Sequence, residues 1–352
     1  MTRGLPTELS TPVDGTGRDR ALQARHSDLL TEAGKSIAYK AEQIALKPDM
    51  PIADAFRIIA SSCLRQFQLN ASLVLACPSE EPLHQARVAI RRLRSALSLF
   101  KSVVADQRLG RFKRDFRDLS HKLGVARDLD VYVARSGPVP EISEDRSRSS
   151  RNLKLTKVVQ LEREQAYRRV TSLLQSKRFR LLMHDFEIWI LAGPWCTSNE
   201  REHAGHDRSI PEFAAHVLSR RWRKFKHRGR HLDRLTSHEQ HRIRIDAKKM
   251  RYASEFFSSL MKDPKHIRRH KTFVAALESL QTVLGDLNDM RSRPKTSARR
   301  SRSEAAPAKT SDAQREAAGR PGASSKRLAA LLTVAVEAHR KLLHSRPFWK
   351  SG

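Results

Sequence analysis

Two segments of the chain place a histidine and three basic side chains at the same spacing. They read HQARVAIRRLR (84–94) and HRIRIDAKKMR (241–251), and a basic residue follows each histidine after three, seven and ten positions. A helix turns by about 100° per residue, so these offsets fall within one stripe roughly 80° wide. Cations crowded on one helix face repel each other, and a bound polyanion would offset that repulsion. We name the two sets the first basic stripe (His84, Arg87, Arg91, Arg94) and the second basic stripe (His241, Arg244, Lys248, Arg251).

Each of these segments also carries an apolar face, centred roughly 120° from its stripe, which is typical of a helix packed on a core. A single charged stripe is most simply interpreted as a solvated helix face without a ligand. A second copy in the same register favours a binding surface instead. The apolar positions are Ala86, Ile90, Leu93, Leu97 and Phe100 in the first copy, and Ile243, Ala247, Met250 and Phe257 in the second.

The overall charge favours an anionic partner. The chain has 352 residues with 68 Lys+Arg against 38 Asp+Glu, a formal net charge of +30. Such an excess attracts polyanions at long range, whether nucleic acid, anionic membrane or inorganic phosphate polymer. The most apolar window, LLMHDFEIWILAGPW, is interrupted by charged residues and predicts a core helix, so we expect no membrane partner. The N-terminus lacks the apolar stretch of a secretory signal, which predicts a soluble, cytoplasmic protein.

Periodicity along the chain predicts an all-α fold. Helices are expected over about 52–75, 84–104, 152–176, 178–192 and 238–261, with another starting near residue 211. Residues 1–20 are polar, and residues 292–327 contain no Leu, Ile, Val or aromatic side chain. Neither segment can offset the entropy of ordering, so we expect a disordered N-terminal tail and a disordered basic insertion.

The repeat extends beyond the stripes. LSHKLGVARDLD (119–130) resembles LQTVLGDLNDM (280–290), and in both a glycine, Gly124 or Gly285, precedes an aspartate by four positions. We expect each glycine to mark a break or turn between two short helices. A period near 160 residues predicts two copies of one helical module, at about 50–140 and 205–350. Packed as a pseudo-twofold pair, they would form one domain in which both stripes line a shared basic groove.

These motifs resemble the CHAD family, the conserved histidine α-helical domain. HQARVAIRRLR and HRIRIDAKKMRY match its two signatures, the two Leu-Gly…Asp segments match as well, and the terminal RPFW fits. The resemblance covers about residues 50–350. It implies a bundle of long helices in two related halves that binds inorganic polyphosphate through a basic surface and can associate with polyphosphate granules. It assigns binding to the eight stripe residues, and with them to Arg117 and Arg127. The sequence departs from the family at Glu278, where a basic residue is usual.

Three other functions compete with polyphosphate binding. Nucleic-acid binding uses the same electrostatics, but single-strand binders stack bases on aromatic side chains and neither stripe contains one. A metal site between His84 and His241 is disfavoured because cations, not carboxylates or thiolates, surround each histidine. Phosphoryl-transfer catalysis needs carboxylates to hold Mg²⁺, whereas Asp246 lies off the stripe and Glu255 is at ion-pair spacing from Arg251. The sequence therefore predicts a binding module with no catalytic residues, no metal site and no cofactor.

Overall fold

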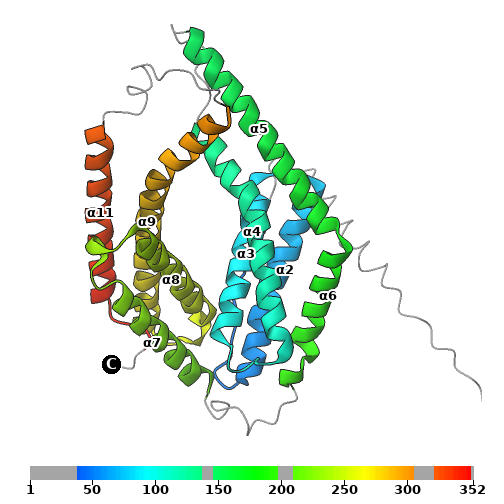
Figure 1. Cartoon of the computed structure of the whole chain (residues 1–352). Helices are drawn as coiled ribbons and strands as arrows, with labels where there is room; N and C mark the ends of the chain where they lie inside the picture. Colours follow the sequence, from blue (N-terminus) through cyan, green and yellow to red (C-terminus); the bar gives the residue numbers. More distant parts are fainter. Residues whose placement is uncertain (1–37, 137–145, 197–208, 305–320, 350–352) are drawn as a thin grey trace, which may run out of the picture.

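The protein is helical throughout its described part. The computed structural model describes residues 38–136, 146–196, 209–304 and 321–349, and every long regular element among them is a helix, which confirms the all-α class (Figure 1). The α-helices are α2 (Ile52–Ala76), α3 (Glu80–Leu99), α4 (Gln107–Ser136), α5 (Arg146–Gln175), α6 (Lys177–Ala192), α7 (Ile210–Arg228), α8 (Ser237–Phe256), α9 (Pro264–Glu304) and α11 (Pro321–His344). Short 3₁₀ turns lie at Pro194–Cys196, Leu232–Arg234 and Ser258–Leu260.

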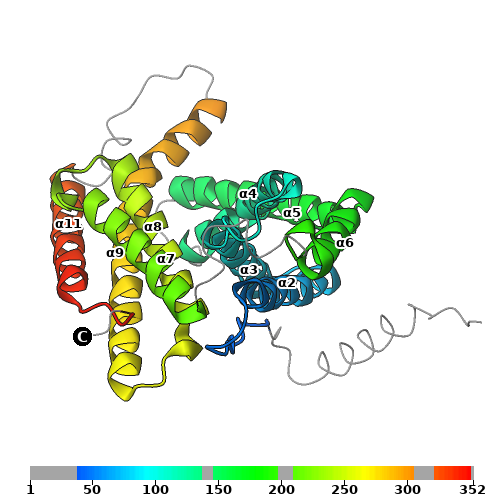
Figure 2. The same cartoon turned by 90° about the horizontal axis from the view of Figure 1, so that it is seen from below.

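The helices form two groups that meet along α3 and α8. In the first group α3 packs on α2 and α4, and α5 and α6 cover the outside. In the second group α8 packs on α7 and α9, and α11 lies along α9. Seen from below, α7, α8, α9 and α11 stand to one side of α2–α6 (Figure 2). The order α2–α3–α4 in one half is thus matched by α7–α8–α9 in the other.

Local signals start the helices that carry the basic stripes. At α8 the Thr236 side chain accepts a hydrogen bond from the backbone N–H of Glu239, whose carboxylate accepts one from the Thr236 backbone N–H. This capping box satisfies two backbone donors that a helix start leaves open. Helix α3 begins at Glu80, one turn earlier than the sequence predicted, and two acidic residues in its first turn complement the helix dipole.

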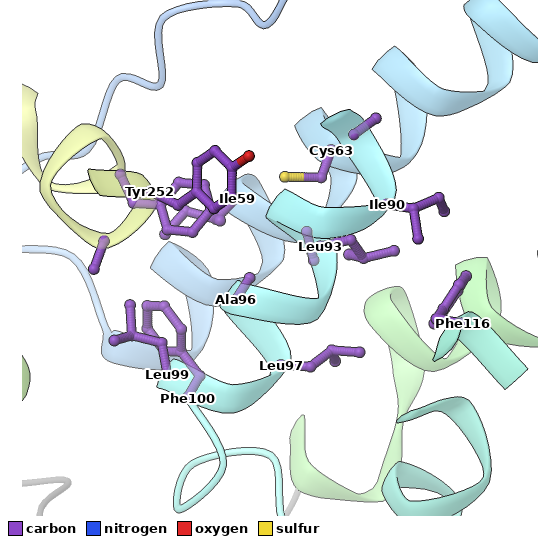
Figure 3. Packing of buried hydrophobic residues seen from close by; sticks show 14 of the residues in the cluster. Ile59, Cys63, Ile90, Leu93, Ala96, Leu97, Leu99, Phe100, Phe116 and Tyr252 are labelled. Carbon is purple, nitrogen blue, oxygen red and sulfur yellow. The ribbon is translucent and has the colours of Figure 1, made fainter. Parts of the chain in front are cut away.

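One hydrophobic core runs through both halves. The Phe100 ring lies 5.0 Å from that of Phe213 and 6.1 Å from that of Phe257, both in the second half. Figure 3 shows Tyr252 of α8 beside Cys63 of α2 and α3 residues of the first half. Aromatic contacts of this kind stabilise the packing beyond the area they bury. The two halves are therefore one folded unit.

The predicted breaks at Gly124 and Gly285 were wrong. Helix α4 continues through Gly124, and α9 continues through Gly285. The Arg87 Nη1 donates a 2.9 Å hydrogen bond to the Gly124 carbonyl, and a Cβ on Gly285 would lie 3.3 Å from Arg244 Nη2. The missing side chain at Gly285 therefore lets Arg244 lie close against the backbone of α9, whereas at Gly124 a Cβ would meet Arg87 at an ordinary 3.6 Å.

Helical backbone also reaches into the segment predicted as a disordered insertion. Helix α9 ends at Glu304 and α11 begins at Pro321, so the prediction for 292–327 was wrong at both flanks. Adding residues to an existing helix needs no new nucleation, and the Ala, Arg and Glu residues here are good helix formers. Residues 305–320, and the predicted tail over 1–20, lie outside the described residues.

Substituting the glycines tests this packing. In Gly124→Ala the added Cβ meets Arg87 Nη2 at 3.6 Å, an ordinary contact, so we expect a gain of about 0.8 kcal/mol in unfolding free energy from helix propensity. Gly285→Ala should gain less, because its Cβ would meet Arg244 Nη2 at 3.3 Å. Urea denaturation measures both changes.

Gly110→Ala is the matched control, since Gly110 lies in α4 with its nearest contact at 3.7 Å and touches no stripe residue. A loss of stability in Gly124→Ala, beside a gain in the control, would contradict the packing described here.

Candidate polyanion-binding surface

The two basic stripes come together where α3 packs on α8. Burial, followed by repulsion from Arg244, Arg91, Arg251 and Arg87, lowers the pKa of Lys248 to about 7. Two of those four arginines belong to α3 and two to α8, so cations from both stripes act on one amine. We call the eight stripe residues, taken together, the central basic surface.

Four cations of this surface form no ion pair with a carboxylate elsewhere in the described chain. They are Arg91, Arg94, Arg244 and Lys248, and each side chain is half-buried. Among the described residues, the one carboxylate paired with Arg87 is that of Asp128, at 3.4 Å, and its side chain is 81% exposed. The surface therefore carries uncompensated positive charge held partly out of water, where charges interact more strongly than in bulk solvent.

The arginines are also short of hydrogen-bond acceptors. The Nε atoms of Arg87, Arg91, Arg244 and Arg251 are buried and have no hydrogen-bond partner among the described residues. A buried donor left unsatisfied costs roughly 1–3 kcal/mol. Arg87 and Arg91 lie on α3, and Arg244 and Arg251 lie on α8, so each stripe carries two donors that a bound anion could satisfy.

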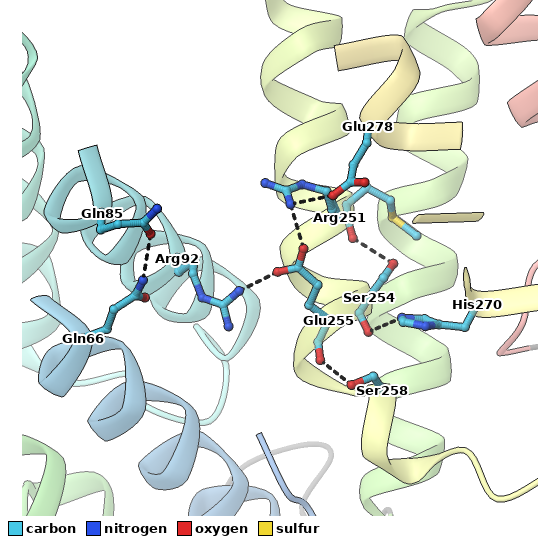
Figure 4. A network of polar contacts seen from close by, with 10 residues as sticks. Gln66, Gln85, Arg92, Arg251, Ser254, Glu255, Ser258, His270 and Glu278 are labelled. Carbon is cyan, nitrogen blue, oxygen red and sulfur yellow. Dashed lines mark hydrogen bonds and ion pairs between the residues drawn. The ribbon is translucent and has the colours of Figure 1, made fainter. Parts of the chain in front are cut away.

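Arg251 differs from the other stripe arginines because carboxylates neutralise it. Its Nη1 donates to Glu255 Oε1 at 2.9 Å, which confirms the predicted ion pair, and to Glu278 Oε1 at 3.1 Å (Figure 4). Glu255 also accepts a hydrogen bond from Arg92 of α3. One glutamate thus links the second basic stripe to the first half of the molecule.

Arg92 has a structural role that the spacing of the stripe does not predict. Its side chain is only 7% exposed, and its guanidinium lies 5.1 Å from the centre of the Phe256 ring. Arg92 lies in the same basic segment as the stripe but points into the junction between α3 and α8. The one sequence signal that Arg92 faces away from the stripe is its spacing: it follows His84 by eight positions and not by three, seven or ten.

The two histidines occupy the first turns of the stripes. Burial, then the charges of Arg127 and Arg91, lower the pKa of His84, so its imidazole is neutral near pH 7. A bound polyanion would favour the protonated ring. His241 is half-buried at the start of α8. No cluster of three or more potential metal-ligating side chains occurs within the described ranges.

The two candidates on α4 have different surroundings. Arg117 is exposed and lies near Arg94, whose pKa is lowered by burial and then by the Arg117 charge. Arg127 makes an ion pair with Glu80 and lies 3.9 Å from the buried carboxylate of Asp130. Arg117 therefore adds free charge beside the first stripe, whereas the charge of Arg127 is offset within the protein.

Carboxylates that could serve catalysis are engaged elsewhere. Asp246 accepts a 2.7 Å hydrogen bond from Arg228 of α7, on the side of α8 away from the stripe. Glu255 is held by Arg92 and Arg251.

In the described helices, no stretch is both long and apolar enough to span a bilayer.

The sequence and the fold match known proteins. The sequence model of the CHAD domain matches residues 58–294. The crystal structure of the CHAD domain from the plant Ricinus communis superposes with a TM-score of 0.68 at 26% identity, covering 88% of this chain and 98% of that chain. None of the curated proteins matches the sequence. The sequence match and the structural match thus agree on one family.

Removing the Lys248 amine should stabilise the free protein. The folded pKa of about 7 lies below the ordinary 10.5, so the unfolded chain binds this proton more tightly. Stability is therefore reduced fully below pH 7 and recovers as pH rises from 7 towards 10.5. We expect Lys248→Met to raise the unfolding free energy on the order of 2–4 kcal/mol at pH 6, and less at pH 9.5.

Thermal unfolding at both pH values measures this difference. Lys271→Met, at an exposed position of α9, is the matched control and should change stability little at either pH. An equal effect of Lys248→Met at pH 6 and pH 9.5 would show that packing, not charge, sets its contribution.

Proposed function

The chain belongs to the CHAD-domain family, and from this premise we propose that it binds inorganic polyphosphate on the central basic surface. The observation that carries the proposal is the convergence of two basic stripes on Lys248, with cations from α3 and α8 acting on one amine. A continuous polyanion laid along this junction would offset the repulsion in both stripes at once.

The spacing of the side chains suits a phosphate polymer. Residues three or four apart on a helix rise about 5–6 Å, and successive phosphates of an extended polymer repeat on a broadly similar scale. Arginine presents a planar set of donors that holds phosphate oxygens in pairs. Arg87, Arg91 and Arg94 therefore can meet several phosphates in succession along α3.

The surroundings of the surface favour phosphate over nucleic acid. Proteins that bind single strands stack bases on exposed aromatic rings. Tyr252, the aromatic residue next to the second stripe, is only 3% exposed and packs between Arg251 and the core. A base would find cations here but no ring, so the backbone phosphate is the group that this surface recognises.

We infer a binding role rather than a catalytic one. The carboxylates around the surface accept hydrogen bonds from arginines, an arrangement that shapes a cationic face rather than holding Mg²⁺ for phosphoryl transfer. We further propose that the protein is cytoplasmic and associates with polyphosphate granules. A granule offers many polymer segments, and a surface that recognises only repeated phosphates suits such a target.

Competition binding tests the proposal. Long-chain polyphosphate should displace single- and double-stranded DNA at matched phosphate concentration and near-physiological salt, because binding needs no base. Its log affinity should fall steeply with log salt as counterions are released. Duplex DNA that outcompetes polyphosphate at equal phosphate would instead favour nucleic acid as the ligand.

Charge reversal locates the binding surface. Arg91→Glu/Arg94→Glu should lower affinity at least about tenfold with the fold retained, and Lys248→Glu/Arg251→Glu should do the same, because one polymer bridges both stripes. Arg168→Glu/Arg169→Glu changes the net charge equally on α5, which packs on α4, α6 and α2, and should have a small effect. Half the binding capacity at unchanged affinity in either stripe variant would indicate two separate sites.

Polymer binding should also take up protons. Lys248 has a pKa of about 7 in the free protein, and a bound polyanion raises it by favouring the charged amine. Above pH 7 binding therefore draws a proton from solution, and affinity falls as pH rises. Calorimetric titration at pH 8 in buffers of different ionisation enthalpy measures this uptake.

Lys248→Arg provides the matched comparison because arginine keeps its proton over this range. It should bind with less proton uptake and a flatter pH dependence than the wild type. Uptake that is unchanged in Lys248→Arg would assign the proton to another group, of which His84 is the nearest candidate on this surface.

A further inference from the structure

Corresponding positions of the two halves carry opposite charges beside the central basic surface. Gly124 and Gly285 occupy equivalent places, each against the first arginine of a stripe, Arg87 or Arg244. Seven residues before each glycine, two helical turns away on nearly the same face, stand Arg117 in α4 and Glu278 in α9. Arg117 lies near Arg94, and Glu278 lies 3.1 Å from Arg251. The equivalent contacts are thus Arg–Arg in one half and Arg–Glu in the other.

The Arg94–Arg117 end has cations without a counter-charge. Burial lowers the pKa of Arg94, and repulsion from the neighbouring Arg117 charge lowers it further. Arg117 is exposed, and neither arginine forms an ion pair within the described chain. A phosphate that arrives between them relieves the repulsion and meets two guanidinium groups.

The Arg251 end already holds carboxylates in that position. A single nitrogen of Arg251, Nη1, donates to both Glu255 and Glu278 (Figure 4). Glu255 is fixed by its second contact, with the buried Arg92. Glu278 has 54% of its side chain exposed, and Arg251 is its ion-pair partner among the described residues. Glu278 is therefore the carboxylate that an incoming phosphate would displace.

We propose that Glu278 acts as a built-in competitor for the polymer, so that the central basic surface has a strong phosphate subsite at Arg94 and Arg117 and a weak one at Arg251. The inference rests on the proposed polyphosphate function and adds the order in which the two ends of the surface are occupied. A short phosphate chain occupies the Arg94–Arg117 end alone. A long chain anchored there presents its next phosphates to Arg251 at high effective concentration and displaces Glu278. Glu278 thereby makes binding depend on polymer length.

Calorimetric titration with tripolyphosphate and with long-chain polyphosphate tests this asymmetry. Glu278→Gln keeps the side-chain size but removes the competing charge. We expect it to raise affinity for the long chain about fivefold at moderate salt. The slope of log affinity against log salt should steepen by about one, because about one more counterion is released. Arg117→Gln should weaken tripolyphosphate binding several-fold more than Arg251→Gln does, since Arg251 is already neutralised.

Glu337→Gln is the matched control. Glu337 lies in α11, has 51% of its side chain exposed and is paired with Lys341 at 2.9 Å, so the substitution makes the same change in net charge away from the surface. If Glu337→Gln and Glu278→Gln raise affinity equally, the competitor role is overturned while polyphosphate binding stands. If the wild type binds no polyphosphate at all, the proposed function falls and this inference falls with it. Melting curves of each variant confirm that the fold is retained.

Discussion

The ion pair between Arg92 and Glu255 holds α3 against α8 at the place where like charges from the two helices repel each other. Arg92 is almost fully buried, and its guanidinium lies over the rings of Tyr252 and Phe256 of the other half. Removing one partner of a buried pair leaves an uncompensated charge, which typically destabilises a protein by about 3–5 kcal/mol. This contact, with the aromatic core beneath it, fixes the separation of the two stripes and hence the geometry of the central basic surface.

The surface is maintained against its own electrostatics. The depressed pKa of Lys248 and the unsatisfied Nε atoms of four arginines both lower the stability of the free protein. A fold selected only for stability would place carboxylates beside these cations. This protein does so on the opposite side of α8, where Asp246 pairs with Arg228. Natural proteins keep such unfavourable groups mainly where function requires them. The continuous core between Phe100, Phe213 and Phe257 supplies the stability that tolerates them.

Periodicity in the sequence predicted the faces of the stripe helices, because the positions of Ile90 and Arg91 on a helix follow from spacing alone. Periodicity did not predict the features that depend on contacts with a neighbouring helix. Gly124 predicts a helix break because glycine is a poor helix former, but α4 continues through it, and its carbonyl accepts a hydrogen bond from Arg87 of α3. Arg92 reads as a surface residue, since the rings that bury it come from residues about 160 positions away. The α3–α8 junction therefore could not be derived from either segment alone.

The difference between Arg91 and Lys248, which hold the same place in the two stripes, has a physical consequence. Arginine keeps its charge under all ordinary conditions, whereas lysine releases its proton when burial and neighbouring cations lower its pKa enough. With arginine in both places, the free protein would hold every one of these charges at the junction. With lysine in one place, the pKa of about 7 lets the amine lose its charge as pH rises through 7, which relieves its repulsion with the neighbouring arginines. The proposed polyanion would reverse this loss, because its own charge favours the protonated amine. On the proposed function, the junction would thus be less repulsive when empty and more cationic when occupied.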